Sequence, residues 1–141
     1  MEQRLSLVTL GVGDIARSRR FYEAMGWTAS SASLESVVFF QLGGIGLSLY
    51  GRAPLAEDAG LAPEGSGFGG IALAHNVRSP AEVDATLAHA AASGGRILKP
   101  GAKVFWGGYS GYFADPDGHP WEIAWNPGFP LGEDGALHLP R

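Results

Sequence analysis

The sequence predicts an α+β fold in which two β-α-β-β-β units follow one another along a chain of 141 residues. Three observations support this prediction: a strand-then-helix pattern occurs twice, both helices have clear start signals, and strand-like runs follow each helix. One such unit cannot bury both its helix and its sheet, whereas two units can do so together. We therefore expect a single domain over residues 1–141.

The first unit is expected at residues 5–51, and it opens with a strand at residues 7–12, whose side chains alternate between two faces. Asp14 is well placed to N-cap the helix that follows, and Gly26 is well placed to end it. The apolar positions of this helix include Ile15, Phe21, Tyr22 and Met25. Strand-like runs follow at residues 36–42 and 45–50.

The second unit is expected at residues 68–126, with its first strand near residues 71–75. Ser79, Pro80 and Glu82 form a capping box with proline at the first helical position, which predicts a helix start. The apolar stripe of that helix is expected to contain Val83, Leu87, Ala90 and Ala91. Further strands are expected at residues 96–98, 109–114 and 120–125.

The remaining segments have the composition of connections. Residues 52–67 are rich in Ala, Gly, Pro and Glu and are expected to link the two units. Residues 127–141 carry Pro and Gly with little periodicity, so we expect a C-terminal tail that drapes over the sheet.

Composition excludes several classes of protein. A net charge of −4 without a basic cluster of useful size argues against nucleic acid as a partner. The absence of cysteine excludes disulfides, thiolate catalysis and Cys-type zinc sites, and it is compatible with the expected cytoplasmic location. No apolar run approaches the ~20 residues that span a membrane, so no membrane partner is expected.

A hairpin near the end of the chain carries the strongest motif. Asp115-Pro116-Asp117-Gly118 has the residue order of a type I turn, and Glu122 follows in the next strand. Together with the tandem repeat and the run Asp14 to Glu23, this hairpin resembles the vicinal oxygen chelate superfamily, which includes glyoxalases, bleomycin resistance proteins and extradiol dioxygenases. The resemblance implies a curved mixed sheet around a cavity.

The resemblance also implies where a metal would bind. In metal-dependent relatives the first and last strands of each unit supply the ligands, and these positions map here to Leu7, Ser48, Gly70 and Glu122. Only Glu122 has a side chain suited to a zinc or iron site, which needs about three protein ligands. The four histidines are interpreted as exposed or structural residues, so no metal and no cofactor is expected.

The cavity face follows from strand alternation within the implied fold. That face should hold Glu122 as the candidate catalytic or anchoring carboxylate among apolar and aromatic side chains. The candidate ligand-binding residues are Thr9, Gln41, Ser48, Tyr50, Trp106, Tyr109 and Tyr112.

The function expected from these features is metal-free binding of an aromatic or amphipathic small molecule in the sheet cavity, by a homodimer. Two alternatives stay open: a metal-dependent glyoxalase-like lyase or dioxygenase, and a metal-free acid/base enzyme that uses Glu122. Whether the protein is an enzyme is left open at this point.

Overall fold

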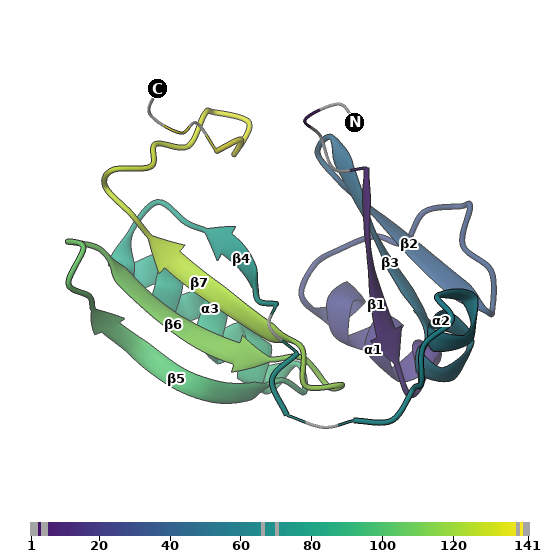
Figure 1. Cartoon of the computed structure of the whole chain (residues 1–141). Coiled ribbons are helices and arrows are strands. Elements are labelled where there is room, and N and C mark those ends of the chain that lie inside the picture. Colours follow the sequence, from purple (N-terminus) through teal and green to yellow (C-terminus); the bar gives the residue numbers. More distant parts are fainter. Residues whose placement is uncertain (1–2, 4–5, 66, 70, 138, 140–141) are drawn as a thin grey trace. The chain divides into compact units, whose positions relative to one another are not determined.

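The computed structural model describes residues 3, 6–65, 67–69, 71–137 and 139. Contacts within the chain divide it into two compact units, Met1–Gly69 and Gly70–Arg141. The first unit is a sheet with two helices packed against it, and the second is a sheet with one helix among its described residues (Figure 1). No helix among the described residues is both long enough and apolar enough to cross a membrane.

The first unit contains a three-stranded sheet in the order β1-β3-β2. β1 runs parallel to β3, and β2 pairs antiparallel to β3. A single antiparallel bridge between Ala29 and Phe40 adds strand material beside β2. The elements are β1 (Leu7–Val12), α1 (Ile15–Ala24), β2 (Val37–Leu42), β3 (Ile45–Gly51) and α2 (Arg52–Asp58).

Helix α1 forms where its cap and its apolar spacing predict. The Asp14 carboxylate accepts a hydrogen bond from the Arg17 amide at 2.9 Å, which satisfies one of the unpaired amides of the first turn. Tyr22 packs against Trp27 and Phe40, with ring centroids 5.0 and 5.9 Å apart. These aromatic contacts place α1 on the face of the sheet that carries Phe40.

The second unit contains a four-stranded sheet in the order β4-β7-β6-β5. Its first and last strands, β4 and β7, run parallel, and β7, β6 and β5 pair antiparallel in turn. The same parallel pairing of first and last strands occurs in the first unit. The elements are β4 (Leu73–Asn76), α3 (Pro80–Ala92), β5 (Arg96–Lys103), β6 (Tyr109–Ala114) and β7 (Pro120–Trp125).

Helix α3 lies across one face of β5, β6 and β7 (Figure 1). Its predicted stripe is buried at Val83, Leu87 and Ala90, whereas Ala91 is exposed, contrary to the prediction. The helix approaches β6 closely at Gly111, where a Cβ would lie 2.6 Å from Leu87 Cδ1 and 2.8 Å from the Lys99 carbonyl oxygen. Glycine at this position therefore lets helix and strand pack in contact.

Both side chains of the predicted capping box, Ser79 and Glu82, accept a hydrogen bond from a main-chain amide at the start of α3, but the Glu82 bond goes to a different amide than expected. The Ser79 hydroxyl accepts from the Glu82 amide at 3.2 Å, as expected for an N-cap. The Glu82 carboxylate, however, reaches back to the Arg78 amide at 2.7 Å rather than to that of Ser79. The Glu82 carboxylate therefore links the first turn of α3 to Arg78, the residue before the N-cap.

Three boundaries differ from the sequence predictions. The expected linker contains helix α2, because Ala, Leu and Glu are good helix formers and Pro54 falls in the first turn, where its missing N–H costs little. Strand β4 starts at Leu73, and the Gly70 of the predicted strand lies outside the described residues. Strand β5 continues to Lys103, because register irregularities carry it through Pro100 and Gly101.

The hairpin between β6 and β7 has the predicted turn. The Gly118 amide donates to the Asp115 carbonyl at 2.9 Å, and Gly118 has φ +90°, a conformation that glycine adopts without strain. The Asp115 side chain, only 3% exposed, accepts from the amides of Asp117 and His119 at 3.0 and 2.9 Å. This buried carboxylate therefore fixes the turn that leads into the strand of Glu122.

We predict that Asp115→Ala lowers the free energy of unfolding by about 1–3 kcal/mol, because two amides lose their acceptor in a buried turn. Urea denaturation of the full chain measures the change. Asp134→Ala is the matched control, since Asp134 also accepts from a turn amide, that of Ala136, but in an exposed turn. Its cost should stay within about 0.5 kcal/mol, and equal losses in both variants would contradict the role given to Asp115.

Candidate functional site

In the first unit, the predicted site residues lie on the sheet face opposite α1. Phe40 and Leu47 are paired in register and belong to the buried face that α1 covers. Because side chains alternate, Thr9, Ser48 and Phe39, which are also in register, lie on the other face. The Thr9 and Ser48 hydroxyl oxygens are 2.7 Å apart and form a hydrogen bond.

The other predicted residues of that unit share this face. Leu7 and Gln41 both pair with Gly46, and Tyr50 pairs with Gly11. The Gln41 amide nitrogen, however, donates to the carbonyl oxygens of Gly43 and Ile45, at 2.6 and 3.2 Å. Gln41 therefore stabilises the turn between β2 and β3.

In the second unit, one row of side chains crosses the sheet on the face opposite α3. Strand register aligns Lys99 with Tyr112, Tyr112 with Glu122, and Glu122 with Ala74. Gly111 is the close contact for Leu87 of α3, so Tyr112, its neighbour in the strand, must point away from that helix. The predicted carboxylate and one predicted tyrosine thus lie side by side.

Tyr112 and Glu122 are cross-strand neighbours, and Glu122 affects the ionisation of the phenol. The pKa of the Tyr112 hydroxyl is raised above its ordinary value of 10.0, first by burial and then by the charge of Glu122 and a hydrogen bond to it. The phenol therefore stays protonated over the physiological pH range and can donate to the carboxylate. The pair provides one donor and one strong acceptor within reach of each other.

Tyr109 and Trp106, two further predicted ligand-binding residues, do not belong to this row. Tyr109 pairs with Trp125 on the α3 side, and its hydroxyl donates to Asp84 of α3 at 3.0 Å. This bond is the main reason for the raised pKa of Tyr109. Trp106 belongs to the turn between β5 and β6, where its ring lies over Gly108. Tyr109 is thus separated from Tyr112 by the thickness of the sheet.

Lys99 is a residue of this row that sequence reasoning missed. Its register with Tyr112 depends on the irregular pairing on both sides of Lys99 in β5. A bulge changes which residue faces which side of a strand, and alternation counted along the sequence cannot reveal it. The only available signal was a cationic residue directly after the apolar pair Ile97-Leu98 near the start of β5.

The register also corrects one position of the metal-ligand set that the family resemblance implied. Leu7 pairs with Gly46, two residues before Ser48. In the second unit, the equivalent residue lies two positions before Ala74, which pairs with Glu122. That residue is Ala72, not Gly70, and Gly70 itself lies outside the described residues.

These four positions do not fit a metal centre. They hold Leu7, Ser48, Ala72 and Glu122, of which only the carboxylate is a usual ligand. Elsewhere in the described part of the chain, no group of three or more His, Asp or Glu side chains is arranged to hold a metal ion. The donor set therefore gives no basis for a step that passes through a metal.

Known protein families include one whose model matches most of this chain. The family model of the Glyoxalase/Bleomycin resistance protein/Dioxygenase superfamily matches residues 4–123. The chain belongs to this superfamily.

Solved structures agree with the assignment to the superfamily. A glyoxalase-related enzyme from Fulvimarina pelagi is 41% identical, with a TM-score of 0.89 and 99% of each chain covered. A protein from Agrobacterium tumefaciens is 31% identical over 89% of this chain and 100% of that one, with a TM-score of 0.71. A superfamily member from Nocardioides is 26% identical over 94% and 91%, with a TM-score of 0.72. No curated protein matches the sequence.

We predict that Glu122→Gln lowers the pKa of Tyr112 toward its ordinary value, because the mutation removes the negative charge that opposes ionisation of the phenol. Desolvation remains, so the pKa should not fall below that value. NMR titration of a sample with ¹³Cζ-labelled tyrosine measures each phenol separately. Tyr109, which contacts Asp84, is the internal control and should not move; an unchanged Tyr112 would contradict the pairing.

Proposed function

We propose that this member of the superfamily binds an aromatic or amphipathic small molecule without a metal, against the sheet face of the second unit that lies opposite α3. The observation that carries the proposal is the Tyr112–Glu122 pair, a polar anchor on a face that α3 does not cover. The superfamily's own ligand positions supply no second metal donor beside Glu122.

The neighbours of this pair support the proposal by their size. In β6 and β7, which carry the pair, and in the adjacent strand β4, the nearest residues on the same face are small: Ala74, Ser110, Ala114, Pro120 and Ala124. The α3 face of the same strands carries Phe113, Trp121 and Ile123 instead. Tyr112, Glu122 and Lys99 are therefore the long side chains of their neighbourhood, and they present functional groups rather than fill a core.

The chemistry of the pair defines the expected ligand. The Glu122 carboxylate accepts hydrogen bonds, so it suits a hydroxyl, phenol or ammonium group of a ligand. The Tyr112 ring offers an apolar surface for an aromatic group, with its hydroxyl as a donor or acceptor. In the first unit, Phe39 and Tyr50 combine aromatic surface with the Thr9–Ser48 hydroxyl pair in the same way.

A second function is favoured by the same pair. A carboxylate hydrogen-bonded to a phenol can accept a proton from a ligand while the phenol stabilises the charge that remains, as a general acid/base site requires. In that case Glu122→Gln should abolish turnover and change ligand affinity by less than about fivefold. The third alternative, a metal-dependent lyase or dioxygenase, lacks the ligands at Leu7, Ser48 and Ala72.

The proposal includes the cytoplasmic homodimer expected from the sequence. Light scattering on the purified protein tests the dimer, which should have twice the 14.7 kDa mass of the chain.

A thermal-shift screen with aromatic and amphipathic compounds tests the binding function, with each compound measured in EDTA and in added divalent metal. We expect compounds that raise the melting temperature equally in both buffers. Calorimetry on such a compound should show about tenfold weaker binding or more for Glu122→Gln and Tyr112→Phe, because each loses a hydrogen bond to the ligand. Tyr109→Phe, on the α3 face, is the matched control and should bind as the wild type does.

Two outcomes of these experiments would contradict the proposed binding face. If only metal ions raised the melting temperature, or if Tyr109→Phe weakened binding as much as Tyr112→Phe, the proposed binding face would be wrong.

A further inference from the structure

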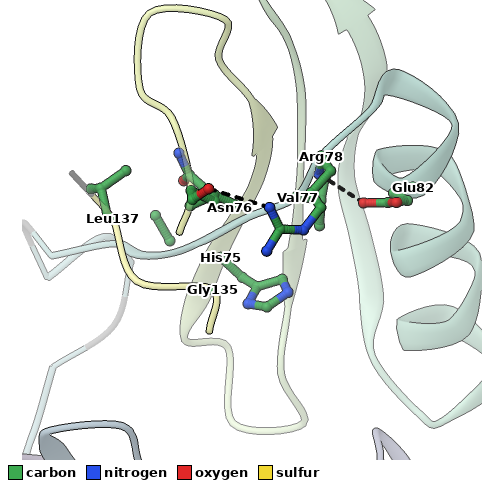
Figure 2. A pocket seen from close by; sticks show the side chains of 9 residues that line it. His75, Asn76, Val77, Arg78, Glu82, Gly135 and Leu137 are labelled. Atoms are coloured by element: carbon green, nitrogen blue, oxygen red, sulfur yellow. Dashed lines mark hydrogen bonds between the residues drawn. The ribbon is translucent and has the colours of Figure 1, made fainter. Parts of the chain in front are cut away.

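A hollow of about 450 Å³ lies beside β4, at the edge of the second sheet. Figure 2 shows it between the segment around β4 and the C-terminal segment of the chain. Its lining residues all belong to the second unit: Ala74, His75, Asn76, Val77, Arg78, Glu82, Leu131, Gly135 and Leu137. Neither Tyr112 nor Glu122 is among them, so the hollow lies at the β4 edge of the proposed ligand face, where Ala74 borders it, and not at the pair itself.

The position of β4 at the edge of the sheet explains how the hollow forms. β4 pairs with β7 on one side and is the end strand of the order β4-β7-β6-β5. Ala74 and Asn76 belong to the face opposite α3, whereas His75 pairs with Ile123 on the α3 face. Because no other strand among the described residues of the second unit pairs with the free side of β4, residues from both faces reach this edge.

Arg78 holds the other wall in place. Its guanidinium donates to the carbonyl oxygens of Leu131, Gly132 and Glu133, at 3.4, 2.6 and 3.4 Å. Residues 131–137 form a tight turn, closed by a bridge between Leu131 and Leu137 and by a bond from the Gly132 amide to the Ala136 carbonyl at 2.8 Å. A single side chain thus fastens this turn opposite β4.

The charge of Arg78 has no carboxylate partner among the described residues. Its three acceptors are main-chain carbonyls, and the nearby Glu82 carboxylate receives the Arg78 amide instead. Three bonds use three of the five guanidinium N–H groups, which leaves donors for a ligand. A cationic group that is held in place but not neutralised, at the wall of a hollow, favours an anion.

The other lining groups agree with a partly apolar anion. His75 is exposed as a residue, yet desolvation lowers the pKa of its imidazole, so at neutral pH the ring is uncharged and offers one N–H donor. The Asn76 amide offers further donors. Ala74, Val77, Leu131 and Leu137 provide the apolar part of the lining. Donors and apolar surface therefore occur together in one hollow.

We propose that the hollow between β4 and the turn at residues 131–137 is a second binding site, for a small carboxylate with an apolar body, and that Arg78 is its charge anchor. Benzoate and hexanoate are the probes that fit this description, and benzamide and hexanamide are their uncharged counterparts. Glu82 also lines the hollow and repels an anion, so the two residues should act on affinity in opposite directions.

NMR titration of the ¹⁵N-labelled full chain tests the site. Benzoate or hexanoate should shift the amides of residues 74–78 and 131–137 in a saturable way, and the matching amide compounds should bind about tenfold more weakly or worse. The absence of a saturable shift at these amides, or equal binding of benzamide and benzoate, would overturn the proposal.

Variants that should change affinity in opposite directions distinguish loss of the Arg78 charge from a general disturbance of the fold. Arg78→Gln should weaken benzoate binding about tenfold or more, and Arg78→Lys should weaken it less because the charge remains. Glu82→Gln should tighten it about two- to fivefold, since glutamine can still accept from the Arg78 amide. Arg96→Gln, an exposed arginine of β5, is the matched control and should change nothing.

Two results with these variants would contradict the proposal. One is equal losses of affinity in Arg78→Gln and Arg78→Lys; the other is a change in the same direction for Arg78→Gln and Glu82→Gln.

Discussion

Parallel pairing between the first and last strands of each unit is the constraint on which the rest of this structure depends. In the first unit it aligns Thr9 with Ser48, and in the second it aligns Ala74 with Glu122. Once these registers are set, alternation decides which side chains meet a helix and which are left on the opposite face. Helix α1 covers one face of the first sheet and α3 covers one face of the second, and the polar residues lie on the opposite faces; in the first unit, α2 packs on that opposite face beside Gly11.

This constraint decides which side chain lies beside Glu122. The turn held by Asp115 and the close packing of α3 over Gly111 leave the neighbouring residue, Tyr112, on the uncovered face, directly beside Glu122. Two of the other metal-ligand positions hold Leu7 of β1 and Ala72, the residue directly before β4, and neither side chain can bind a metal. A carboxylate that relatives use as one ligand among several is therefore paired here with a phenol.

Much of this could be predicted from the sequence, because caps and turns are local. The Asp14 and Ser79 caps and the Asp115 to Gly118 turn depend on residues only a few positions apart. The alignment of the two first strands was wrong by two residues for a physical reason. A shift of two keeps every side chain on its face, so the alternation pattern is the same for Gly70 and Ala72.

The remaining errors concern contacts that only tertiary structure decides. Tyr109 and Tyr112 are three residues apart in one strand, which places them on opposite faces, and Asp84 of α3 then binds the Tyr109 hydroxyl. The bulge that aligns Lys99 with Tyr112 has no periodic signal. Arg78 reaches carbonyls more than fifty residues away in a segment without a pattern, and no local rule predicts such a contact.

The central claim, that Glu122 anchors a ligand on a face without a metal centre, is tested most directly by metal content. The full chain and Glu122→Gln would be dialysed against zinc, nickel, manganese and iron(II), and then washed and analysed for bound metal. The account predicts the same low content in both proteins, well below one ion per chain, because Leu7, Ser48 and Ala72 offer no further ligand. One ion per chain in the wild type that is lost in Glu122→Gln would contradict it.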